Sequence, residues 1–174
     1  GSGASVGLLP TLALNVDDIF GAKHTVETLS CVFVEQNRED LNALLFIHYF
    51  KSCIEPAMSL DFDSVSTPVK EEVVKNYELL LNNLITVINR QPAGDKKCNI
   101  FTTNYDGCFE QASERRLRSG CTDFIVNDGA SGFQKKYFHT KNYNTRLTQC
   151  GIFDQHATLV PQINLYHLHG SVYW

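Results

Sequence analysis

The sequence predicts an α/β fold, with a Rossmann-like parallel sheet flanked by helices and a helical insertion after the first glycine turn. A glycine-rich turn opens the chain, two long helical patterns follow, and a strand, a helix and a second strand succeed one another over residues 98–126. Such a βαβ unit has a right-handed crossover, which makes the sheet parallel. We expect one domain over residues 1–174, mainly helical over residues 15–93, in what is expected to be a fragment of a longer chain with further domains.

Composition narrows the classes of function. At 174 residues, 43% hydrophobic and 20% charged, the chain has enough apolar residues to form a core. Its net charge of −4 argues against nucleic acid as the main partner, because phosphate binding normally requires a basic excess. With no apolar run long enough to cross a bilayer and no signal peptide at its start, we expect a cytoplasmic protein with no membrane partner. The six cysteines form no CxxC pair, so no zinc or other metal site is expected.

Two helical patterns precede the first strand. Residues 39–55 place apolar side chains on more than one face, which predicts a mostly buried helix. The next helix begins with Thr67 as its N-cap and Pro68 at its first helical position. Its apolar residues recur at three and four positions, so one face is expected to pack on the core. These residues are Val73, Tyr77, Leu80, Leu81, Leu84, Ile85 and Ile88.

The C-terminal half alternates strands with a helix. Residues 98–103 (CNIFTT) predict a short buried strand, residues 107–120 a helix that ends near a glycine, and residues 122–126 (TDFIV) a second strand. Residues 131–160 have no clear period and predict loops with at most one short strand. Residues 162–168 (QINLYHL) predict the closing strand.

Polar side chains follow two of these strands directly. Asn104 and Asp106 come after the first strand, and His169 and Gly170 come after the last. Ligands of open parallel sheets bind beyond the carboxyl ends of the strands, so we expect these residues to meet the opening turn at one edge. Taken alone, Asn and Asp at a strand end are more often turn residues, and a His before Gly is more often structural. His167, one pleat deeper on the same side as His169, is assigned a structural role.

The opening stretch GSGASVG is suited to phosphate binding through its backbone. Gly1 and Gly3 allow close approach of a pyrophosphate, and the Ser5 hydroxyl adds a contact. Val6 replaces the third glycine of a GxGxxG fingerprint, which argues against a dehydrogenase. A plain tight turn is the alternative for this stretch.

In this order, the stretches GSGASVGLLPT, TTNYD and LHGS resemble the nucleotide-binding motif and the two site-bearing strand ends of the sirtuin fold. The pair TTNYD and LHGS is similar to that of the sirtuin-like NAD hydrolases of prokaryotic antiphage defence. The resemblance covers residues 1–11, 98–110 and 164–171. The cysteine pairs of the deacetylase zinc module are absent, and Thr103 stands in place of a deacetylase Gln. The resemblance therefore implies cleavage of NAD to nicotinamide and ADP-ribose, with NAD as the substrate and no zinc.

The resemblance also implies roles for individual residues. Asn104 would bind the ribose or the attacking water, and His169 would be the general base toward a ribose hydroxyl or that water. Asp106 would orient nicotinamide or support Asn104. The residues that would complete the NAD site are Gly1, Ser2, Gly3, Ala4, Ser5, Thr103, Gly170 and Ser171.

Three functions from different classes remain open. The first is an NAD glycohydrolase that depletes NAD in bacterial antiphage defence, working as a homo-oligomer with a fused or separate sensor or ATPase partner. The second is a catalytically silent module that binds NAD or ADP-ribose, and the third is an NAD-dependent protein deacylase. The presence of Asn104 and His169 favours the first over the second, and the missing cysteine pairs disfavour the third.

Overall fold

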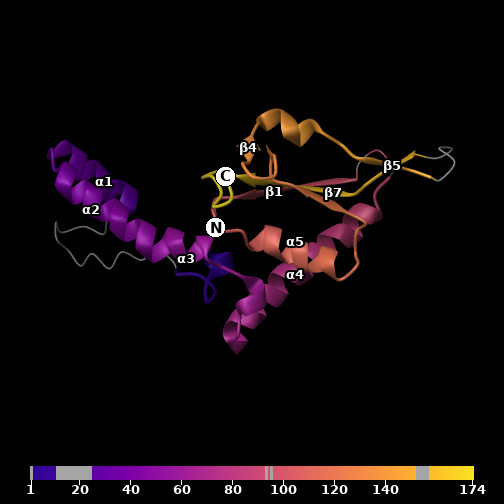
Figure 1. The fold of residues 1–174 in the computed structure, drawn as a ribbon, viewed down its shortest axis with the longest axis horizontal. Coiled ribbons are helices and arrows are strands. Elements are labelled where there is room, and N and C mark those ends of the chain that lie inside the picture. The colour runs from indigo at the N-terminus through magenta and orange to yellow at the C-terminus, as the bar shows by residue number, and fades with distance from the viewer. Residues whose placement is uncertain (1, 11–24, 93, 95, 152–156) are drawn as a thin grey trace. The chain divides into compact units, whose positions relative to one another are not determined.

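The structure is a computed structural model that describes residues 2–10, 25–92, 94, 96–151 and 157–174. It divides into two compact units. One unit consists of Gly1–Leu8 with Asp61–Trp174, and the other of Leu9–Leu60. Figure 1 shows the order of the elements along the chain.

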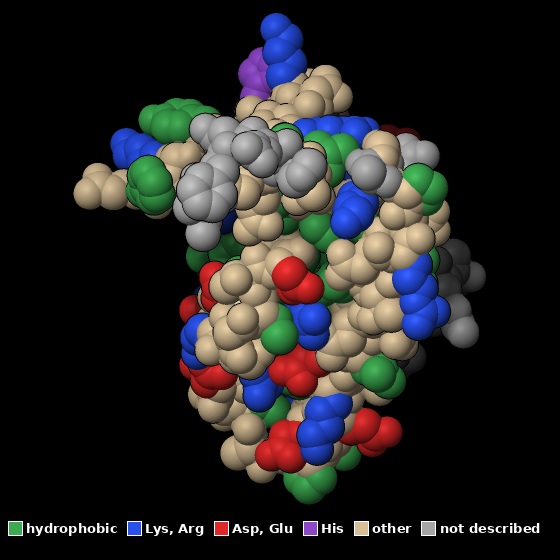
Figure 2. Space-filling model, turned by 90° about the vertical axis from the view of Figure 1, so that its right-hand side faces the viewer, with side chains coloured by type: hydrophobic (Ala, Val, Ile, Leu, Met, Phe, Trp, Pro, Cys, Tyr) green, Lys and Arg blue, Asp and Glu red, His purple; other side chains and the backbone are tan. Residues whose placement is uncertain are grey.

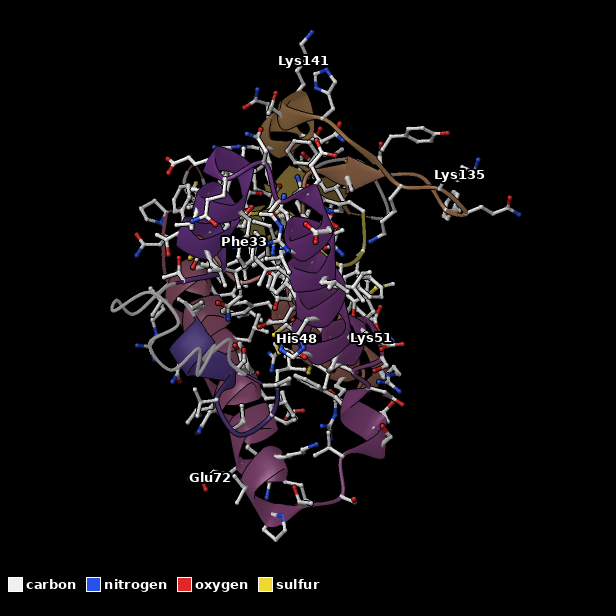
Figure 3. The ribbon with its side chains drawn as sticks, turned by 90° about the vertical axis from the view of Figure 1, so that its left-hand side faces the viewer. Phe33, His48, Lys51, Glu72, Lys135 and Lys141 are labelled. Carbon is white, nitrogen blue, oxygen red and sulfur yellow. The ribbon has the colours of Figure 1, made fainter. Side chains whose placement is uncertain are left out.

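The smaller unit consists of two paired helices, the second of which continues into a π-helical turn and a short third helix. Its elements are α1 (Val26–Glu35), α2 (Glu39–Tyr49), a π-helical turn (Phe50–Ile54) and α3 (Glu55–Met58). Thr25 caps α1 through reciprocal hydrogen bonds with Thr28. A small core of Val26, Leu29 and Leu45 joins the two helices, and Phe33 packs against it between α1 and α2 (Figure 3).

The helical pattern over residues 39–55 is confirmed as helix, but the prediction that it is mostly buried is wrong. Leu44, Ile47 and Phe50 are all exposed, whereas Leu45 and Cys53 are buried. The physical reason is geometric, because α1 covers only one stripe of α2 and apolar residues surround this helix on several sides. Helix α1 lies within residues 15–93, which the sequence predicts to be mainly helical, although no separate pattern marks it.

The larger unit has two helices on one face of its sheet. The predicted second helix is α4 (Pro68–Asn89), which begins after Thr67 as expected, although the Thr67 side chain makes no capping hydrogen bond. Helix α5 (Cys108–Arg118) is the predicted helix after the first strand, and Gly120 follows it with a φ of 90°. The two helices lie side by side below the strands in Figure 1. The residues of α4 that are buried are Val74, Tyr77, Leu81, Ile85 and Ile88.

The sheet is parallel, which confirms the predicted fold class. Its strands are β1 (Lys97–Thr102), β2 (Ile125–Asn127) and β7 (Gln162–His167), in the order β1-β7-β2. The closing strand β7 therefore lies in the centre, with Thr102 of β1 opposite His167. A central strand is covered on both faces, and four consecutive residues of β7 are buried from its first position onward. The predicted burial of the β1 strand holds only in part, because Phe101 is 64% exposed.

The prediction of at most one short strand in residues 131–160 is wrong. Two antiparallel ribbons occur there, β3 (Ala130–Ser131) with β4 (Tyr137–Phe138) and β5 (Thr148–Cys150) with β6 (Ala157–Leu159). Strands of two or three residues are too short to show an alternating pattern in the sequence. A 3₁₀ helix, Thr140–Asn144, lies between the ribbons.

This 3₁₀ helix covers the sheet face opposite to α4 and α5. Tyr143 is buried, and its ring stacks on Tyr166 of β7 at a centroid distance of 4.1 Å. Its hydroxyl lies 2.7 Å from the carbonyl oxygen of Leu165 and 2.8 Å from that of Asp128. Tyr143 thus connects the loop region to the central strand β7. A segment without a regular sequence pattern therefore still contributes to the core.

Surface charges of both signs are interspersed. On the face shown in Figure 2, acidic and basic side chains alternate rather than forming separate patches. Arg115 pairs with Glu78, and Arg118 pairs with Asp63, so part of the basic run in α5 is compensated locally. Across the described residues, no helix combines the length and the apolar character needed to span a membrane.

Candidate functional site

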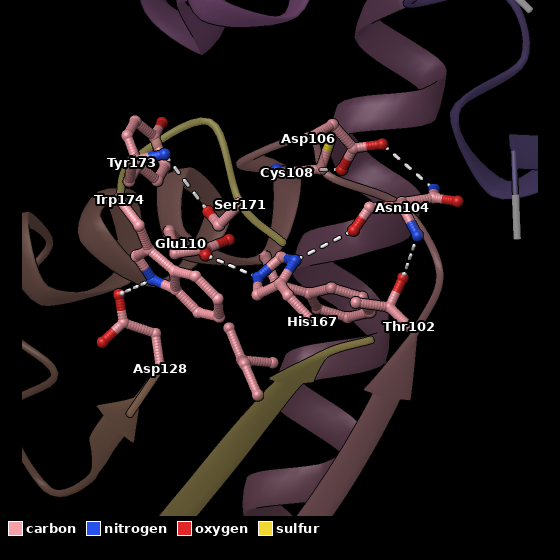
Figure 4. Close-up of polar contacts among 12 residues, drawn as sticks. Thr102, Asn104, Asp106, Cys108, Glu110, Asp128, His167, Ser171, Tyr173 and Trp174 are labelled. Atoms are coloured by element: carbon pink, nitrogen blue, oxygen red, sulfur yellow. Dashed lines mark hydrogen bonds and ion pairs between the residues drawn. The ribbon is translucent and has the colours of Figure 1, made fainter. Parts of the chain in front are cut away.

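The ends of β1 and β7 continue side by side beyond the sheet (Figure 4). The Leu168 amide donates to the carbonyl oxygen of Thr102 at 2.8 Å, and the Val172 amide donates to that of Tyr105 at 2.9 Å. The segments that follow the two strands are therefore hydrogen-bonded neighbours. The expectation that these two strand ends meet at one edge of the sheet is confirmed for the backbone.

The opening turn joins the same edge through the Ser5 side chain. Residues Ser2–Ser5 form a 3₁₀ helix, and the Ser5 hydroxyl is buried. This hydroxyl donates to Asp106 Oδ2 at 2.7 Å, so the Tyr77 hydroxyl, 2.8 Å away, must donate to Ser5 Oγ. The Asn104 side-chain amide also donates to Ser5 Oγ, at 3.3 Å. Ser5 thus connects the opening turn, α4 and the end of β1.

These contacts determine how the Asn104 side chain is oriented. Its Nδ2 group donates to Asp106 Oδ2 at 3.0 Å, and a carboxylate oxygen can be approached only by a donor. The Asn104 main-chain amide donates to Thr102 Oγ1 at 3.0 Å. Asn104 Oδ1 accepts no hydrogen bond within the described part of the chain. The free oxygen of this half-buried side chain is therefore an acceptor available to a bound ligand.

Asp106 is buried and serves several donors at the start of α5. Besides Ser5 and Asn104, the main-chain amide of Cys108 donates to Asp106 Oδ1 at 3.3 Å. A carboxylate at the first turn of a helix is favoured by the positive end of the helix dipole. Burial, followed by the charge of Asp106, raises the pKa of the Cys108 thiol, and burial likewise raises the pKa of Tyr77. Both groups therefore stay protonated, and Cys108 is not a nucleophile at neutral pH.

A second polar cluster lies on the β7 side of Asn104. The His167 Nδ1 atom lies 2.9 Å from the Asn104 carbonyl oxygen, and its Nε2 atom lies 2.8 Å from Glu110 Oε1 of α5. Burial lowers the pKa of His167, but the hydrogen bond and charge of Glu110 outweigh burial and raise the pKa above its ordinary value of 6.5. The structural role that the sequence predicted for His167 agrees with its burial.

His169 has a different environment from His167. Its side chain is exposed, and it forms no hydrogen bond or ion pair within the described residues. Gly170 follows with a φ of 87°, a left-handed conformation that glycine adopts without strain. The Ser171 hydroxyl accepts from the Tyr173 amide at 3.3 Å. His169 is therefore free to contact a ligand beside the end of β1.

Tyr173 contacts the start of α5 through a hydrogen bond and through close packing of its ring. Gln111 donates to the Tyr173 hydroxyl at 3.0 Å, and a Cβ at Gly107 would lie 2.2 Å from the Tyr173 ring. The Trp174 indole donates to Asp128 Oδ2 at 3.4 Å. Gly107 is thus required by the close approach of an aromatic ring, and this approach keeps residues 170–174 beside the Asn104 loop.

The predicted site residues differ in how closely the structure brings them together. Ser5, Asn104 and Asp106 are in direct contact, whereas the sequence predicted only that they would meet at one edge of the sheet. Thr103, Gly3 and Ala4 are near them in sequence and exposed, but no side-chain contact joins them to the network in the described residues. Gly1 lies outside the described residues. Ser2 belongs to the opening 3₁₀ helix.

Two members of the site, Tyr77 and Glu110, do not follow from the sequence. Tyr77 was assigned to the apolar face of α4, and its phenol was given no polar partner. Glu110 lies in the first turn of α5, but no local pattern in the sequence marks it as a member of the site. Its partner His167 is 57 positions away, so only the fold brings the pair together.

A comparison with models of known protein families gives no match, and no curated protein sequence is significantly similar to the chain. Within the described residues, no three His, Cys, Asp or Glu side chains are grouped so that they could hold a metal ion. The function is therefore inferred from the geometry of the site and from the sequence resemblance.

Proposed function

We propose that this chain is a sirtuin-like NAD glycohydrolase, which cleaves the bond between nicotinamide and ribose and releases ADP-ribose. The observation that carries the proposal is the hydrogen-bonded contact of Ser5 with Asn104 and Asp106. These residues come from two of the three motifs that suggested the function, and they are distant in sequence. The third motif, with His169, lies next to them because β1 and β7 are paired.

The orientation of Asn104 suits the proposed reaction. Cleavage gives an oxocarbenium-like centre at C1′ of the ribose, and the bonding electrons move onto the nicotinamide ring, which becomes neutral. Asn104 Oδ1 accepts a hydrogen bond from a ribose hydroxyl or from the attacking water, while Asp106 keeps the amide from rotating. A fixed acceptor of this kind favours one position of the nucleophile.

His169 is the proposed general base. As water adds to C1′, His169 takes up the proton that the water loses, or it deprotonates a ribose hydroxyl that assists the attack. Its exposure beside the Asn104 loop is consistent with contact to a substrate. Both carboxylate oxygens of Asp106 already accept hydrogen bonds, from Ser5, Asn104 and Cys108. We therefore assign Asp106 to the support of Asn104 and not to the orientation of nicotinamide.

The opening turn is the proposed pyrophosphate site. Gly3 and Ala4 are exposed in the 3₁₀ helix, and a Cβ at Gly3 would meet no atom within 4 Å. The Ser5 hydroxyl is occupied by internal partners, so the main-chain amides of the turn are the groups that we assign to phosphate oxygens. The resemblance extends the proposal to a defence effector that works as a homo-oligomer with a sensor or ATPase partner.

The test is nicotinamide release from NAD by the purified protein in its full natural chain. Asn104→Ala and His169→Ala are each expected to abolish release while the circular dichroism spectrum and melting temperature stay close to those of the parent. His48→Ala is the matched control, because the His48 side chain is also exposed but belongs to helix α2 of the smaller unit. Binding of NAD without nicotinamide release would contradict the proposal and identify a silent nucleotide-binding module.

A deacylase is separated from a hydrolase by the product. Supplying an acylated peptide together with NAD would yield an acylated ADP-ribose only if the chain were a deacylase. We expect ADP-ribose and nicotinamide in equal amounts, with or without the peptide.

A further inference from the structure

A buried ionisable pair lies directly behind the proposed catalytic asparagine. Glu110 of α5 and His167 of β7 are 2.8 Å apart, and their side chains are 14% and 0% exposed. Figure 4 shows the His167 imidazole between Glu110 and the main chain of Asn104. The proposed reaction assigns neither side chain a part, and buried ionisable groups require a stabilising partner or a function.

The two hydrogen bonds of His167 fix the number of protons in the pair. The Asn104 carbonyl oxygen can only accept, so His167 Nδ1 carries a proton. A second proton is shared between Nε2 and Glu110 Oε1, either as an imidazolium with a carboxylate or as a neutral imidazole with a carboxylic acid. If that proton is lost to solvent and Nδ1 keeps its own, Nε2 and Glu110 Oε1 face each other as two acceptors. If the tautomer changes so that Nε2 carries the proton, Nδ1 and the Asn104 carbonyl oxygen face each other as two acceptors. One of the two hydrogen bonds must then break, and it is the bond to the neutral Asn104 carbonyl, because the bond to the Glu110 carboxylate is charge-assisted and stronger.

We propose that the Glu110–His167 pair positions Asn104 through its main-chain carbonyl, and that it does so only while the pair holds its shared proton. This inference rests on the proposed function of Asn104 in NAD hydrolysis. It makes His167 and Glu110 positioning residues, and it predicts that activity falls on the alkaline side when the pair loses its proton.

Asn104 is suited to such control because every other polar group of this residue is anchored. Its main-chain amide donates to Thr102, its side-chain amide donates to Asp106 and its carbonyl accepts from His167, which leaves Oδ1 for the substrate. Loss of the carbonyl bond frees the peptide between Asn104 and Tyr105 to rotate. A displacement of the Asn104 side chain follows, and catalysis is sensitive to displacements of about 1 Å.

Burial and Glu110 together set the proton state of the pair, because burial lowers the pKa of His167 and Glu110 raises it. Glu110 Oε2 is buried and accepts no hydrogen bond within the described residues, so His167 is the principal stabilising partner for this carboxylate. The charged group that faces His167 from the Asn104 loop is Asp106, and the Trp174 ring presents its edge at 5.9 Å. Glu110 and Asp106 both raise the pKa of His167, against the effect of burial.

The decisive variant is Glu110→Gln in the full natural chain. A Gln side-chain amide can donate to Nε2 of a neutral imidazole, so the Nδ1 bond to Asn104 persists without a shared proton. Glu114→Gln is the matched control, because Glu114 lies one turn later on α5 and is exposed. The measurements are kcat and KM for NAD as functions of pH, together with the ¹³C resonance of the Asn104 carbonyl.

In the parent and in Glu114→Gln, kcat is expected to fall about tenfold at alkaline pH with little change in KM, equivalent to about 1.4 kcal/mol of transition-state stabilisation. The Asn104 carbonyl resonance should titrate with the same midpoint. In Glu110→Gln, both should stay constant over the same range. A merely structural role would change stability in this variant without removing the alkaline limb.

The outcomes separate this inference from the proposed function. Turnover with the same alkaline limb in the parent and in Glu110→Gln would overturn the inference and keep the function. Absence of turnover would overturn the function and, with it, the catalytic consequence of the pair. Even without turnover, the pH dependence of the Asn104 carbonyl resonance decides whether the Glu110–His167 pair positions Asn104. A resonance that does not change with pH in the parent would overturn that positioning as well.

Discussion

Ser5 and Asp106 are 101 positions apart in the sequence and share a hydrogen bond of 2.7 Å. Both side chains are buried, and the bond links the opening turn to the end of the first strand of the sheet. The same carboxylate oxygen accepts from the Asn104 amide. Asp106 is therefore the common acceptor that gives Ser5 and Asn104 fixed positions relative to each other.

Removing the Ser5 hydroxyl should destabilise the larger unit. Ser5→Ala leaves Tyr77 without its acceptor and takes one donor from Asp106, and unsatisfied buried groups of this kind cost about 1–3 kcal/mol. The free energy of unfolding in urea measures the loss. Ser66→Ala is the control, because Ser66 is exposed and should change this free energy by less than about 0.5 kcal/mol. Equal effects of the two substitutions would show that the buried network contributes little.

The two histidines of the YHLHGS stretch, His167 and His169, should differ in their effect on stability. His169→Ala is expected to lower the rate of nicotinamide release by at least about 100-fold, since that is the typical contribution of a general base. It should leave stability within about 0.5 kcal/mol, because His169 is exposed.

His167→Ala is expected to lower the melting temperature, because it leaves Glu110 buried without its partner. Turnover assays and thermal melts on the same preparations compare the two variants. A stable, active His169→Ala protein would exclude His169 as the base.

Gly107→Ala should loosen the C-terminal segment. The new methyl group would lie 2.2 Å from the Tyr173 ring, and overpacking of this kind costs about 1–3 kcal/mol. Gly94→Ala serves as a control, because a Cβ at Gly94 meets nothing within 4 Å. Adding Tyr173→Ala to Gly107→Ala should cancel the clash, so a double-mutant cycle in urea unfolding should show strong coupling. Additive effects would mean that the ring does not approach Gly107.

Stability should fall as the pH rises above neutrality. The pKa of His167 is raised in the folded state above its ordinary value of 6.5, so its contribution is complete below about pH 6.5 and is lost as the pH passes the raised value. Urea unfolding at a series of pH values measures this dependence. Glu110→Gln should remove the fall, whereas Glu114→Gln should retain it. A stability that is constant from about pH 6 to 9 in the parent would contradict the pair's contribution.

The cysteines should differ strongly in reactivity. Cys31 and Cys150 are exposed, whereas Cys108 is fully buried and has a raised thiol pKa. A thiol alkylating reagent should therefore label Cys31 and Cys150 in the native protein and label Cys108 only after unfolding. Peptide mass spectrometry measures the extent of labelling at each position. Rapid native labelling of Cys108 would show that the network around Asp106 opens readily.

The elements with long, regular patterns could be predicted from the sequence. The periodic apolar residues and the Thr67–Pro68 start predicted α4, and the short apolar runs predicted β1 and β7, because these signals depend on neighbours along the chain. The motif order also predicted that Asn104 and Asp106 would meet the opening turn. The two ribbons in residues 130–159 escaped prediction because strands of two or three residues have no period.

The partners of the buried polar side chains follow from the fold and not from the sequence. The sequence placed Tyr77 on an apolar face and assigned Glu110 no role, yet Tyr77 binds Ser5 and Glu110 binds His167. It also assigned the Ser5 hydroxyl to a phosphate, whereas the fold directs that hydroxyl to Asp106. Hydrogen bonds between distant residues depend on the packing of α4 and α5 against the sheet, and no local pattern in the sequence specifies that packing.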